Sequence, residues 1–327
     1  VFFVFFLCII VGVTAGNYPF PQNSTYPYGI KPATPNTSKI ASLYNAWVDT
    51  YYKEGSATVN GKTVNAARIE FDDPGYSVSE GIAYGMLIFV YMDGVTETNT
   101  FKTTSMQTKF DRLYNYYSAW SKYSYGSSGR KYLMNWKIQG FSTITSANSA
   151  TDAEIDIALA LLMAHKQWGS TGTINYAVEA ENLMTAIYEK EVDPTDHLLY
   201  PGDAWYDNVV KNPCYFETAA LKLFDVAQTQ IGFTTTKNWS SVYSACNTFL
   251  KDKAQNTSTG LFPDWCNSDG SKITSSKYSG LGYDFNWDAC RTPWRVAWDY
   301  VWWGSTEGLA MSERTANWLN KSSITPS

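Results

Sequence analysis

Histidine is nearly absent from this 327-residue sequence, which contains only His165 and His197. A histidine-based metal site or a Ser/His/Asp triad is therefore hard to build. Basic clusters are also missing: no run of five or six Lys and Arg occurs, and the formal net charge is −5. A nucleic-acid partner is disfavoured, because such proteins usually concentrate basic charge in one patch.

Long apolar runs are scarce as well, and the only candidate is VFFVFFLCIIVGVTAG at the start. This run is too short to span a bilayer and ends in small residues. We interpret residues 1–16 as a partial secretory signal peptide that is cleaved near Ala15 or Gly16, and expect the start of the gene to be missing because no Met precedes it. A buried strand is the alternative, disfavoured by the Asn, Pro and Ser that follow. The protein is expected to be secreted and extracellular, with no membrane contact after cleavage.

Cysteine is the other scarce residue type. Removal of the signal peptide leaves four cysteines, which an oxidising compartment would allow to form two disulfides in any of three connectivities. Four buried free thiols are the equally open alternative. Five N-x-[ST] sequons also fit secretion, although they carry meaning only in a eukaryotic protein. The cysteines are Cys214, Cys246, Cys266 and Cys290, and the sequons begin at Asn23, Asn36, Asn238, Asn256 and Asn320.

Aromatic residues, in contrast, are abundant: 13 Trp, 24 Tyr and 16 Phe make up 16% of the chain. A large core that uses aromatic rings as filler explains this composition. A groove in which flat side chains stack on sugar rings explains it too, and composition alone does not decide between them.

The periodicity of apolar residues predicts helices in a single domain, residues 39–327, after an extended lead-in at residues 17–38. No alternation of strands with helices is visible, so a parallel α/β sheet is disfavoured. Long loops rich in Gly, Ser, Trp and Tyr separate the helices, and long loops in compact domains are usually functional. The loops span 124–149, 191–213 and 254–287. The predicted helices span 39–54, 78–92, 107–123, 151–168, 174–190, 214–230, 238–253, 288–303 and 307–320.

The first candidate acid is Glu80, in the stretch SVSEGIAYGML. Ser77 and Glu80 match a capping box, in which the glutamate only returns a hydrogen bond to the backbone. The same helix nevertheless contains three small residues, Gly81, Ala83 and Gly85. Each glycine lowers the stability of a helix by roughly 1 kcal/mol relative to alanine. A close approach by a substrate or by another helix explains that cost, so both a structural and a functional role stay open.

The second candidate is Asp152, in SATDAEIDIALALLMAHKQW. Thr151 and Glu154 form another possible capping box. Asp152 falls at the first helical position, where the helix dipole favours an anion, and Asp156 lies one turn further along the same face. Acids in a first turn are common, so the ordinary interpretation stays open here too.

The third candidate is Asp288, in NWDACRTPWRVAWDY. It precedes Arg291 by three residues, and Pro293 suits a first helical turn. Asp288 is then an N-cap or a paired surface acid. Its position between Trp287 and Trp294 instead suggests a partly desolvated site.

The three acids share one pattern, since each lies at a predicted helix N-terminus beside a long or aromatic loop. If those ends face the same way, the acids converge. Glycoside hydrolysis needs such a pair, one carboxyl protonated to release the leaving oxygen and one ionised to activate water or attack. Helix N-termini lower carboxyl pKa values, so Glu80 would need the negative charge of Asp152 or Asp288 to raise its pKa.

Several long motifs, in order from about Ser38 to Ser322, resemble glycoside hydrolase family 8, and most closely its secreted bacterial endoglucanases. The stretch ATDAEIDIALALLMAHKQW resembles the family signature. The other motifs are SEGIAYGM, LMNWKI, HKQWGSTGTINY, YPGDAW, NPCYF, GLFPDWCNSDG and WDACRTPWRVAWDY.

This resemblance implies an all-α fold, an (α/α)6 barrel with six inner helices inside six outer ones, and an inverting mechanism without a cofactor or metal. Carried over by motif, Glu80 is the general acid and Asp288 the general base that activates water. Asp152 holds and distorts the sugar at the cleavage point. Arg291 and Tyr215 are expected to order that site.

The resemblance also implies substrate-binding side chains. Trp136 and Trp205 are expected to be stacking platforms, and Tyr84 to contribute to substrate binding. The family's domain continues for several helices beyond Ser327, so the barrel is expected to lack its closing helices and the domain to be C-terminally incomplete.

Three positions depart from the family pattern. Glu154 stands where Asp is usual, which is conservative. Cys214 replaces a usual Ser, and Cys290 occupies a small-residue position; these two are expected to be paired or buried as small apolar groups.

The sequence therefore predicts a monomeric, secreted endo-β-1,4-glucanase that acts on cellulose or β-glucan. An endo-β-1,4-xylanase is the nearest alternative, because the same catalytic residues serve both. A chitosanase is disfavoured, since related chitosanases place the base in an inserted loop. A carbohydrate-binding protein with a dead site is disfavoured by the intact acids, and a Ca²⁺- or Mg²⁺-dependent hydrolase by the lack of EF-hand-like spacing.

Overall fold

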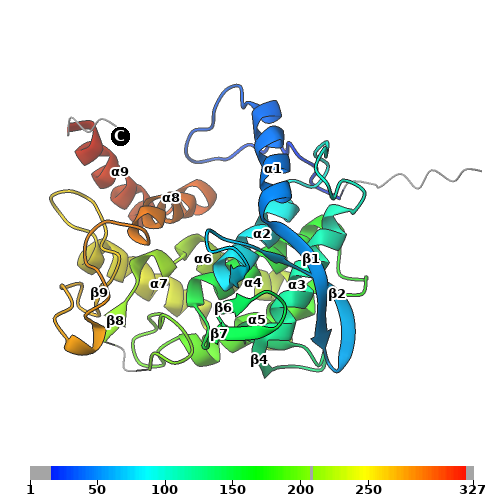
Figure 1. Ribbon diagram of the computed structural model, residues 1–327. Coiled ribbons are helices and arrows are strands. Elements are labelled where there is room, and N and C mark those ends of the chain that lie inside the picture. Colours follow the sequence, from blue (N-terminus) through cyan, green and yellow to red (C-terminus); the bar gives the residue numbers. More distant parts are fainter. Residues whose placement is uncertain (1–15, 207–208, 322–327) are drawn as a thin grey trace, which may run out of the picture.

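The computed structural model describes residues 16–206 and 209–321 as a mainly helical body that carries small antiparallel sheets (Figure 1). Each of the nine predicted helices has an observed counterpart in the described residues, with ends that differ by no more than four residues. The helices are α1 (Thr37–Tyr51), α2 (Ser79–Tyr91), α3 (Met106–Trp120), α4 (Thr151–Trp168), α5 (Tyr176–Glu191), α6 (Thr218–Ile231), α7 (Trp239–Phe249), α8 (Thr292–Trp303) and α9 (Thr306–Lys321).

Short strands were not predicted, and the structure adds them in the loops between helices. The longest pair, β1 and β2, is a hairpin whose turn residues Asn60 and Gly61 both have positive φ, of 52° and 73°. Asn-Gly turns of this kind match the twist of the flanking strands. The strands are β1 (Tyr52–Val59), β2 (Lys62–Ile69), β3 (Tyr76–Val78), β4 (Ser121–Ser124), β5 (Lys131–Met134), β6 (Lys137–Gln139), β7 (Thr143–Ser146), β8 (Val210–Lys211) and β9 (Cys266–Asn267).

The pairing of these strands is antiparallel throughout, and β3–β6 and β8–β9 join segments that lie far apart in the chain. The order is β1–β2, β3–β6–β7, β4–β5 and β8–β9. None of these sheets separates layers of helices, so the strands shape the loops while the helices build the core.

The helices form two layers. In the first layer, α2 packs on α4, α4 on α6 and α6 on α8. In the second, α3, α5, α7 and α9 each pack on the helix that precedes them in the chain. Burial agrees with this division: 14 of the 18 residues of α4 are buried, as expected for a helix surrounded by others. The four helices of the first layer run in the same direction, since their last turns line one hollow, so their N-termini gather at the opposite end.

The described cysteines are all free thiols. Cys214, Cys246 and Cys266 are buried, whereas Cys290 is exposed. Burial as a small group therefore holds for Cys214 but is wrong for Cys290. The short 3-10 helix Ala289–Arg291 turns Ala289 into the core and leaves Cys290 on its outer side.

Among residues 16–206 and 209–321, no helix combines the length and the hydropathy that crossing a membrane requires.

Candidate active site

One arginine joins three carboxylates that lie far apart in the sequence. Nη1 of Arg291 binds Oδ2 of Asp152 at 2.7 Å and also binds Oε1 of Glu80, while Nη2 binds Oδ1 of Asp288 at 2.6 Å. Glu80 comes from the start of α2, Asp152 from the start of α4, and the other two from the turn before α8. The structure therefore brings the three candidate acids together at the N-terminal ends of the first-layer helices.

Neither predicted capping box is formed. Ser77 lies in β3 and no side chain caps α2. Thr151 donates to the carbonyl oxygen of Tyr200 at 2.7 Å instead of capping α4. Glu154 is buried and accepts a hydrogen bond of 2.5 Å from the hydroxyl of Tyr117 on α3. These side chains have tertiary partners, so local capping is not what fixes the acids at these helix starts.

Glu80 and Asp152 influence each other's charge, because both carboxyl groups bind Arg291 and lie close together. Burial raises the pKa of Glu80 above the usual range, repulsion by Asp152 raises it further, and attraction to Arg291 opposes both effects. Burial likewise raises the pKa of Asp152, against the attraction of Arg291. Oδ1 of Asp152 is buried without a hydrogen-bond partner. One carboxyl of the site is thus held toward its protonated form, as an acid catalyst requires.

Asp288 has two further donors that the sequence analysis missed. Its Oδ2 accepts hydrogen bonds of 3.0 Å from Nδ2 of Asn212 and from Nε1 of Trp265. Asn212 is the first residue of the motif NPCYF, and Trp265 lies within the motif GLFPDWCNSDG. Their presence in these motifs was the signal by which the sequence could have indicated a role in the site. The sequence suggested that Trp287 shields the Asp288 carboxylate from solvent. This is wrong, because the Trp287 side chain is 84% exposed. Trp265 contacts the carboxylate instead.

Aromatic rings extend from this carboxylate. The ring of Tyr215 lies 5.8 Å from the guanidinium carbon of Arg291 and packs edge-on against Trp265 at 6.0 Å. Trp205 stacks on Trp265 at 5.9 Å and on Tyr278 at 5.7 Å, with near-parallel planes. Two of the predicted substrate-binding residues, Tyr215 and Trp205, are therefore connected to Asp288 through Trp265.

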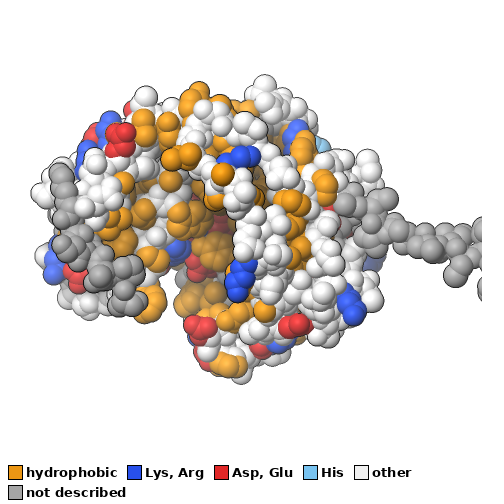
Figure 2. Space-filling view, turned by 90° about the horizontal axis from the view of Figure 1, so that it is seen from above, with side chains coloured by type: hydrophobic (Ala, Val, Ile, Leu, Met, Phe, Trp, Pro, Cys, Tyr) orange, Lys and Arg blue, Asp and Glu red, His pale blue; other side chains and the backbone are white. Residues whose placement is uncertain are grey.

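Trp136 lies beside the start of α2, close in space to the residue before Glu80. It is 40% exposed, and its carbonyl oxygen accepts a hydrogen bond of 2.9 Å from the N–H of Ser79, the residue before Glu80. Figure 2 looks down on the molecule and shows a hollow near the centre of this face, with acidic and hydrophobic side chains between the side that carries α8 and α9 and the side that carries α1 and α2. The site thus combines carboxylates with exposed and half-buried aromatic rings.

Tyr84 was predicted to bind substrate, but its hydroxyl group forms hydrogen bonds with other side chains of the protein. It donates to Oε1 of Glu80 at 3.0 Å, and Nη2 of Arg295 lies 3.4 Å from the same hydroxyl. Arg295 was not singled out from the sequence, although it lies in the last of the quoted motifs.

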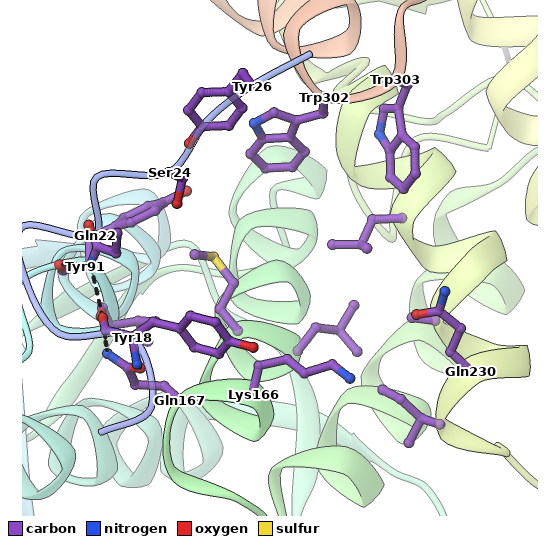
Figure 3. A pocket seen from close by; sticks show the side chains of 16 residues that line it. Tyr18, Gln22, Ser24, Tyr26, Tyr91, Lys166, Gln167, Gln230, Trp302 and Trp303 are labelled. Atoms are coloured by element: carbon purple, nitrogen blue, oxygen red, sulfur yellow. Dashed lines mark hydrogen bonds between the residues drawn. The ribbon is translucent and has the colours of Figure 1, made fainter. Parts of the chain in front are cut away.

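A second hollow lies at the opposite ends of the same helices (Figure 3). Its volume is about 450 Å³, and its walls include the ends of α2, α4, α6 and α8 together with Tyr18, Gln22 and Tyr26 of the N-terminal segment. Gln22 caps the end of α2 by donating to the carbonyl oxygen of Tyr91 at 2.6 Å. No Asp or Glu lines this hollow, and it lies roughly 18 Å from the carboxylates, the length of α2. Of these two hollows in the described residues, the one at the N-terminal ends carries the carboxyl groups that acid/base chemistry needs.

Within the described part of the chain, no group of three or more His, Cys, Asp or Glu side chains is arranged to hold a metal ion. What the site offers is a pair of carboxyl groups, Glu80 and Asp288, on different nitrogens of one guanidinium. Proton donation by one and proton removal by the other is the chemistry that such a pair supports.

The chain is similar over most of its length to several known proteins. The chain is 36% identical over 320 residues to Endoglucanase 2 of Ruminiclostridium josui, an alignment that covers 95% of this chain and 62% of that protein. It is 34% identical over 323 residues to a Beta-glucanase of Niallia circulans, covering 94% of this chain and 72% of that protein. The chain thus spans less than two thirds of the length of the first of these relatives.

The apo structure of a beta-1,3-1,4-glucanase from Paenibacillus sp. X4 superimposes with a TM-score of 0.77 at 31% sequence identity, covering 94% of this chain and 79% of that one. The family profile described as Glycosyl hydrolases family 8 matches residues 18–326. With the motifs, the clustered carboxylates and these matches in agreement, this chain belongs to glycosyl hydrolase family 8.

Proposed function

We propose that this protein is an inverting endo-β-1,4-glucanase that hydrolyses internal bonds of cellulose or β-glucan. The observation that carries the proposal is the convergence of Glu80, Asp152 and Asp288 on Arg291 within an aromatic site. Relatives named endoglucanase and beta-glucanase over almost the whole chain support a glucan substrate before a xylan one.

In the proposed mechanism, Glu80 is the general acid. Its raised pKa keeps the carboxyl protonated until the glycosidic oxygen is in place, and the proton then moves to that oxygen as the C–O bond breaks. Asp288 is the general base and takes a proton from the water that attacks the opposite face of the sugar. Its donors Asn212 and Trp265 hold it in place for that step.

Asp152 is proposed to bind the sugar at the cleavage point. Its Oδ2 is occupied by Arg291, but Oδ1 is buried without a hydrogen-bond partner. An unpaired buried oxygen costs free energy unless a ligand completes it, and a sugar hydroxyl is a suitable donor. Trp136, Trp205 and Tyr215 are proposed to contact neighbouring sugar rings.

We further propose a fold of the (α/α)6 barrel type, in which the two observed helix layers are parts of the inner and outer rings. Export from the cell is proposed on the apolar segment at residues 1–15, which lies outside the described residues, and on the sequons. A polysaccharide substrate is too large to enter a cell, which agrees with an extracellular enzyme.

The substrate proposal is tested by release of reducing sugar from carboxymethyl-cellulose, mixed-linkage β-glucan, xylan and chitosan under identical conditions. We expect activity on the two glucans. Activity on xylan alone would establish the alternative xylanase, and a protein that melts cooperatively but releases nothing would be a binding protein.

The roles of the two carboxyls are tested by Glu80→Gln and Asp288→Asn, which keep shape but remove the titrating group. Each is expected to lower kcat by about 100-fold or more, because general acid and general base catalysis contribute on this order. Asp252→Asn, at an exposed acid after α7, is the matched control and should leave kcat unchanged. Near-normal kcat in either site variant contradicts the role assigned to that residue.

The inverting stereochemistry has its own test. Proton NMR during early turnover should show the α-anomer as the first product from a β-linked glucan, since a water attacks from the opposite face. The β-anomer as first product would instead require a covalent intermediate and would overturn the role of Asp288 as a base.

A further inference from the structure

A second layer of polar and charged side chains lies one helical turn below the carboxylates that bind Arg291. Its members are each four residues further along the same helices: Tyr84 after Glu80 on α2, Asp156 after Asp152 on α4, and Arg295 after Arg291 on α8. Residues four apart lie on the same face of a helix, roughly 6 Å further along its axis. The lower layer therefore repeats the upper one, with a tyrosine in the position of the proposed acid.

Arg295 is the centre of the lower layer and is almost fully buried. Its Nη2 binds Oδ2 of Asp156 at 2.9 Å, and its Nη1 binds Glu217, the residue that directly precedes α6. The indole of Trp294 lies 4.7 Å from its guanidinium carbon. A buried ion cluster of this kind costs desolvation free energy and seldom exceeds a hydrophobic core in stability. A role in the site above it would account for that cost.

Tyr84 connects the two layers. Its hydroxyl has one hydrogen to donate, whereas the guanidinium of Arg295 has donors only. With Nη2 of Arg295 at 3.4 Å on the acceptor side of the hydroxyl oxygen, the hydrogen of Tyr84 is directed to Oε1 of Glu80 at 3.0 Å. Arg295 thus determines in which direction Tyr84 donates.

The consequence falls on the two oxygens of Glu80. Oε1 already accepts from Tyr84 and from Arg291, so a third hydrogen on that atom is disfavoured. Oε2 has no hydrogen-bond partner within residues 16–206 and 209–321, and the Glu80 side chain keeps 33% of its exposure. Oε2 is therefore the oxygen on which a protonated Glu80 carries its hydrogen toward the cleft.

We propose that Arg295 and Tyr84 are positioning residues that fix Oε1 of Glu80 as a hydrogen-bond acceptor and Oε2 as the oxygen that delivers the proton, an inference that rests on the proposed function. The proton leaves Oε2 for the glycosidic oxygen as the bond from that oxygen to the anomeric carbon breaks. The negative charge left on Glu80 is then stabilised at Oε1 by the hydroxyl of Tyr84 and by Arg291. The water that attacks the anomeric carbon gives its proton to Asp288, so protons and charge balance.

The groups that face Glu80 determine the sign of the expected pH effect. They are Asp152 on α4, Arg291 and Arg295 from the α8 segment, and Tyr84 on its own helix, and Asp288 acts through Arg291. The donation from Tyr84 stabilises the ionised form of Glu80 and so lowers its pKa. Loss of that donor raises the pKa of Glu80, and the alkaline limb of the kcat profile, where the acid loses its proton, moves to higher pH.

The first test is Tyr84→Phe, which keeps the ring and removes the hydroxyl. On mixed-linkage β-glucan we expect kcat at the optimum to fall about fivefold, the value of one hydrogen bond, with the alkaline limb at higher pH and KM within about twofold. Tyr91→Phe, the same change seven residues further along α2, is the control and should leave both quantities unchanged. An unchanged alkaline limb in a folded, active Tyr84→Phe variant overturns the proposal.

The second test asks whether Arg295 acts through Tyr84. Arg295→Lys keeps the positive charge beside Asp156 and Glu217 but loses the forked donors, so we expect the alkaline limb to move in the same direction as in Tyr84→Phe. Added to Tyr84→Phe, it should shift the limb no further, because the connecting hydroxyl is already gone. A further shift in the double variant overturns the role of Tyr84 as the connection.

Two outcomes separate this inference from the proposed function. A wild-type protein that is folded but inactive on both glucans contradicts the proposed function itself. An active wild type whose pH profile is the same in Tyr84→Phe contradicts only the positioning roles. Melting curves identify any variant that has lost its fold, and Tyr84→Phe decides the inference alone if Arg295→Lys does not fold.

Discussion

At the scale of single residues, the site depends on one negative charge that raises the pKa of a neighbour. Asp152 is buried within reach of Glu80, and after burial its repulsion is the next cause that raises the pKa of the glutamate. Arg291 opposes this effect by binding both carboxyls. The acid strength of Glu80 thus depends on its burial and, beyond that, on charged side chains from other helices.

Asp152→Asn should therefore move the alkaline limb of the kcat profile to lower pH, opposite to the direction expected for Tyr84→Phe. The substitution removes the repelling charge and leaves Arg291 free to favour ionised Glu80, so the acid loses its proton earlier. The residual rate of the variant, measured on an activated aryl glycoside across the pH range, gives the limb. A limb that stays in place would mean that Asp152 does not control the acid.

Sequence motifs identified the residues that touch the proposed chemistry but not those that hold them. Glu80, Asp152, Asp288 and Arg291 stand in long motifs at predicted helix starts. Asn212, Trp265, Arg295 and Glu217 were missed, because their partners lie 23 to 139 residues away along the chain or across the helix layers. Local pattern carries no information about such partners, and the two wrong capping boxes failed for the same reason.

At the scale of secondary structure, periodic apolar residues were enough to locate the helices, whereas the strands were too short to show a period. Strands of two to four residues present at most two side chains to each face. The β1–β2 hairpin is longer and does carry an Asn-Gly turn signal at Asn60 and Gly61. The hairpin was not predicted, because the strong helical periodicity of the segments before and after it, now α1 and α2, determined the interpretation of this region.

The two glycines of α2, Gly81 and Gly85, have different surroundings in the structure, so their small size has different causes. A Cβ on Gly85 would lie 2.7 Å from Cγ1 of Ile69 on β2 and 2.8 Å from Cδ1 of Leu113 on α3. A Cβ on Gly81 would meet nothing closer than Val78, at 3.7 Å. Close packing of protein elements therefore explains Gly85 but not Gly81.

Gly85→Ala should destabilise the fold and Gly81→Ala should not. Overpacking costs typically about 1–3 kcal/mol, and over most of that range the cost is larger than the roughly 1 kcal/mol that alanine gains over glycine in a helix. At Gly81 a Cβ meets no close neighbour, so only the gain in helix propensity from alanine applies. Denaturant unfolding of the two variants beside the wild type measures both, and equal stability of the two would contradict the packing seen around Gly85.

At the scale of the whole molecule, many buried carboxyl groups determine how stability depends on pH. Burial raises the pKa of Glu154 to about 8, and it also raises the pKa values of Glu191 and Glu217 well above the ordinary range. These groups come from α4, the end of α5 and the start of α6, so the effect is spread through the inner part of the fold. His165, whose pKa burial lowers, works in the opposite direction as a single, less buried group.

Whether stability rises or falls with pH depends on which state, folded or unfolded, binds more protons. Between the ordinary glutamate pKa of about 4.5 and the raised folded value of about 8, the folded protein holds protons that the unfolded chain has released. Stability contributed by these groups is complete below about pH 4.5 and is lost as the pH rises toward 8. We therefore expect the melting temperature to fall between about pH 5 and pH 8, with the most stable range mildly acidic.

Glu154→Gln tests this dependence because glutamine imitates the protonated carboxyl at every pH. The variant should show a smaller fall in melting temperature between about pH 5 and pH 8 than the wild type, since one of the groups that releases a proton on unfolding is gone. Glu313→Gln, at an exposed glutamate of α9, should reproduce the wild-type slope. A wild-type melting temperature that is level or rises over this range would mean that the buried carboxyls are ionised in the fold.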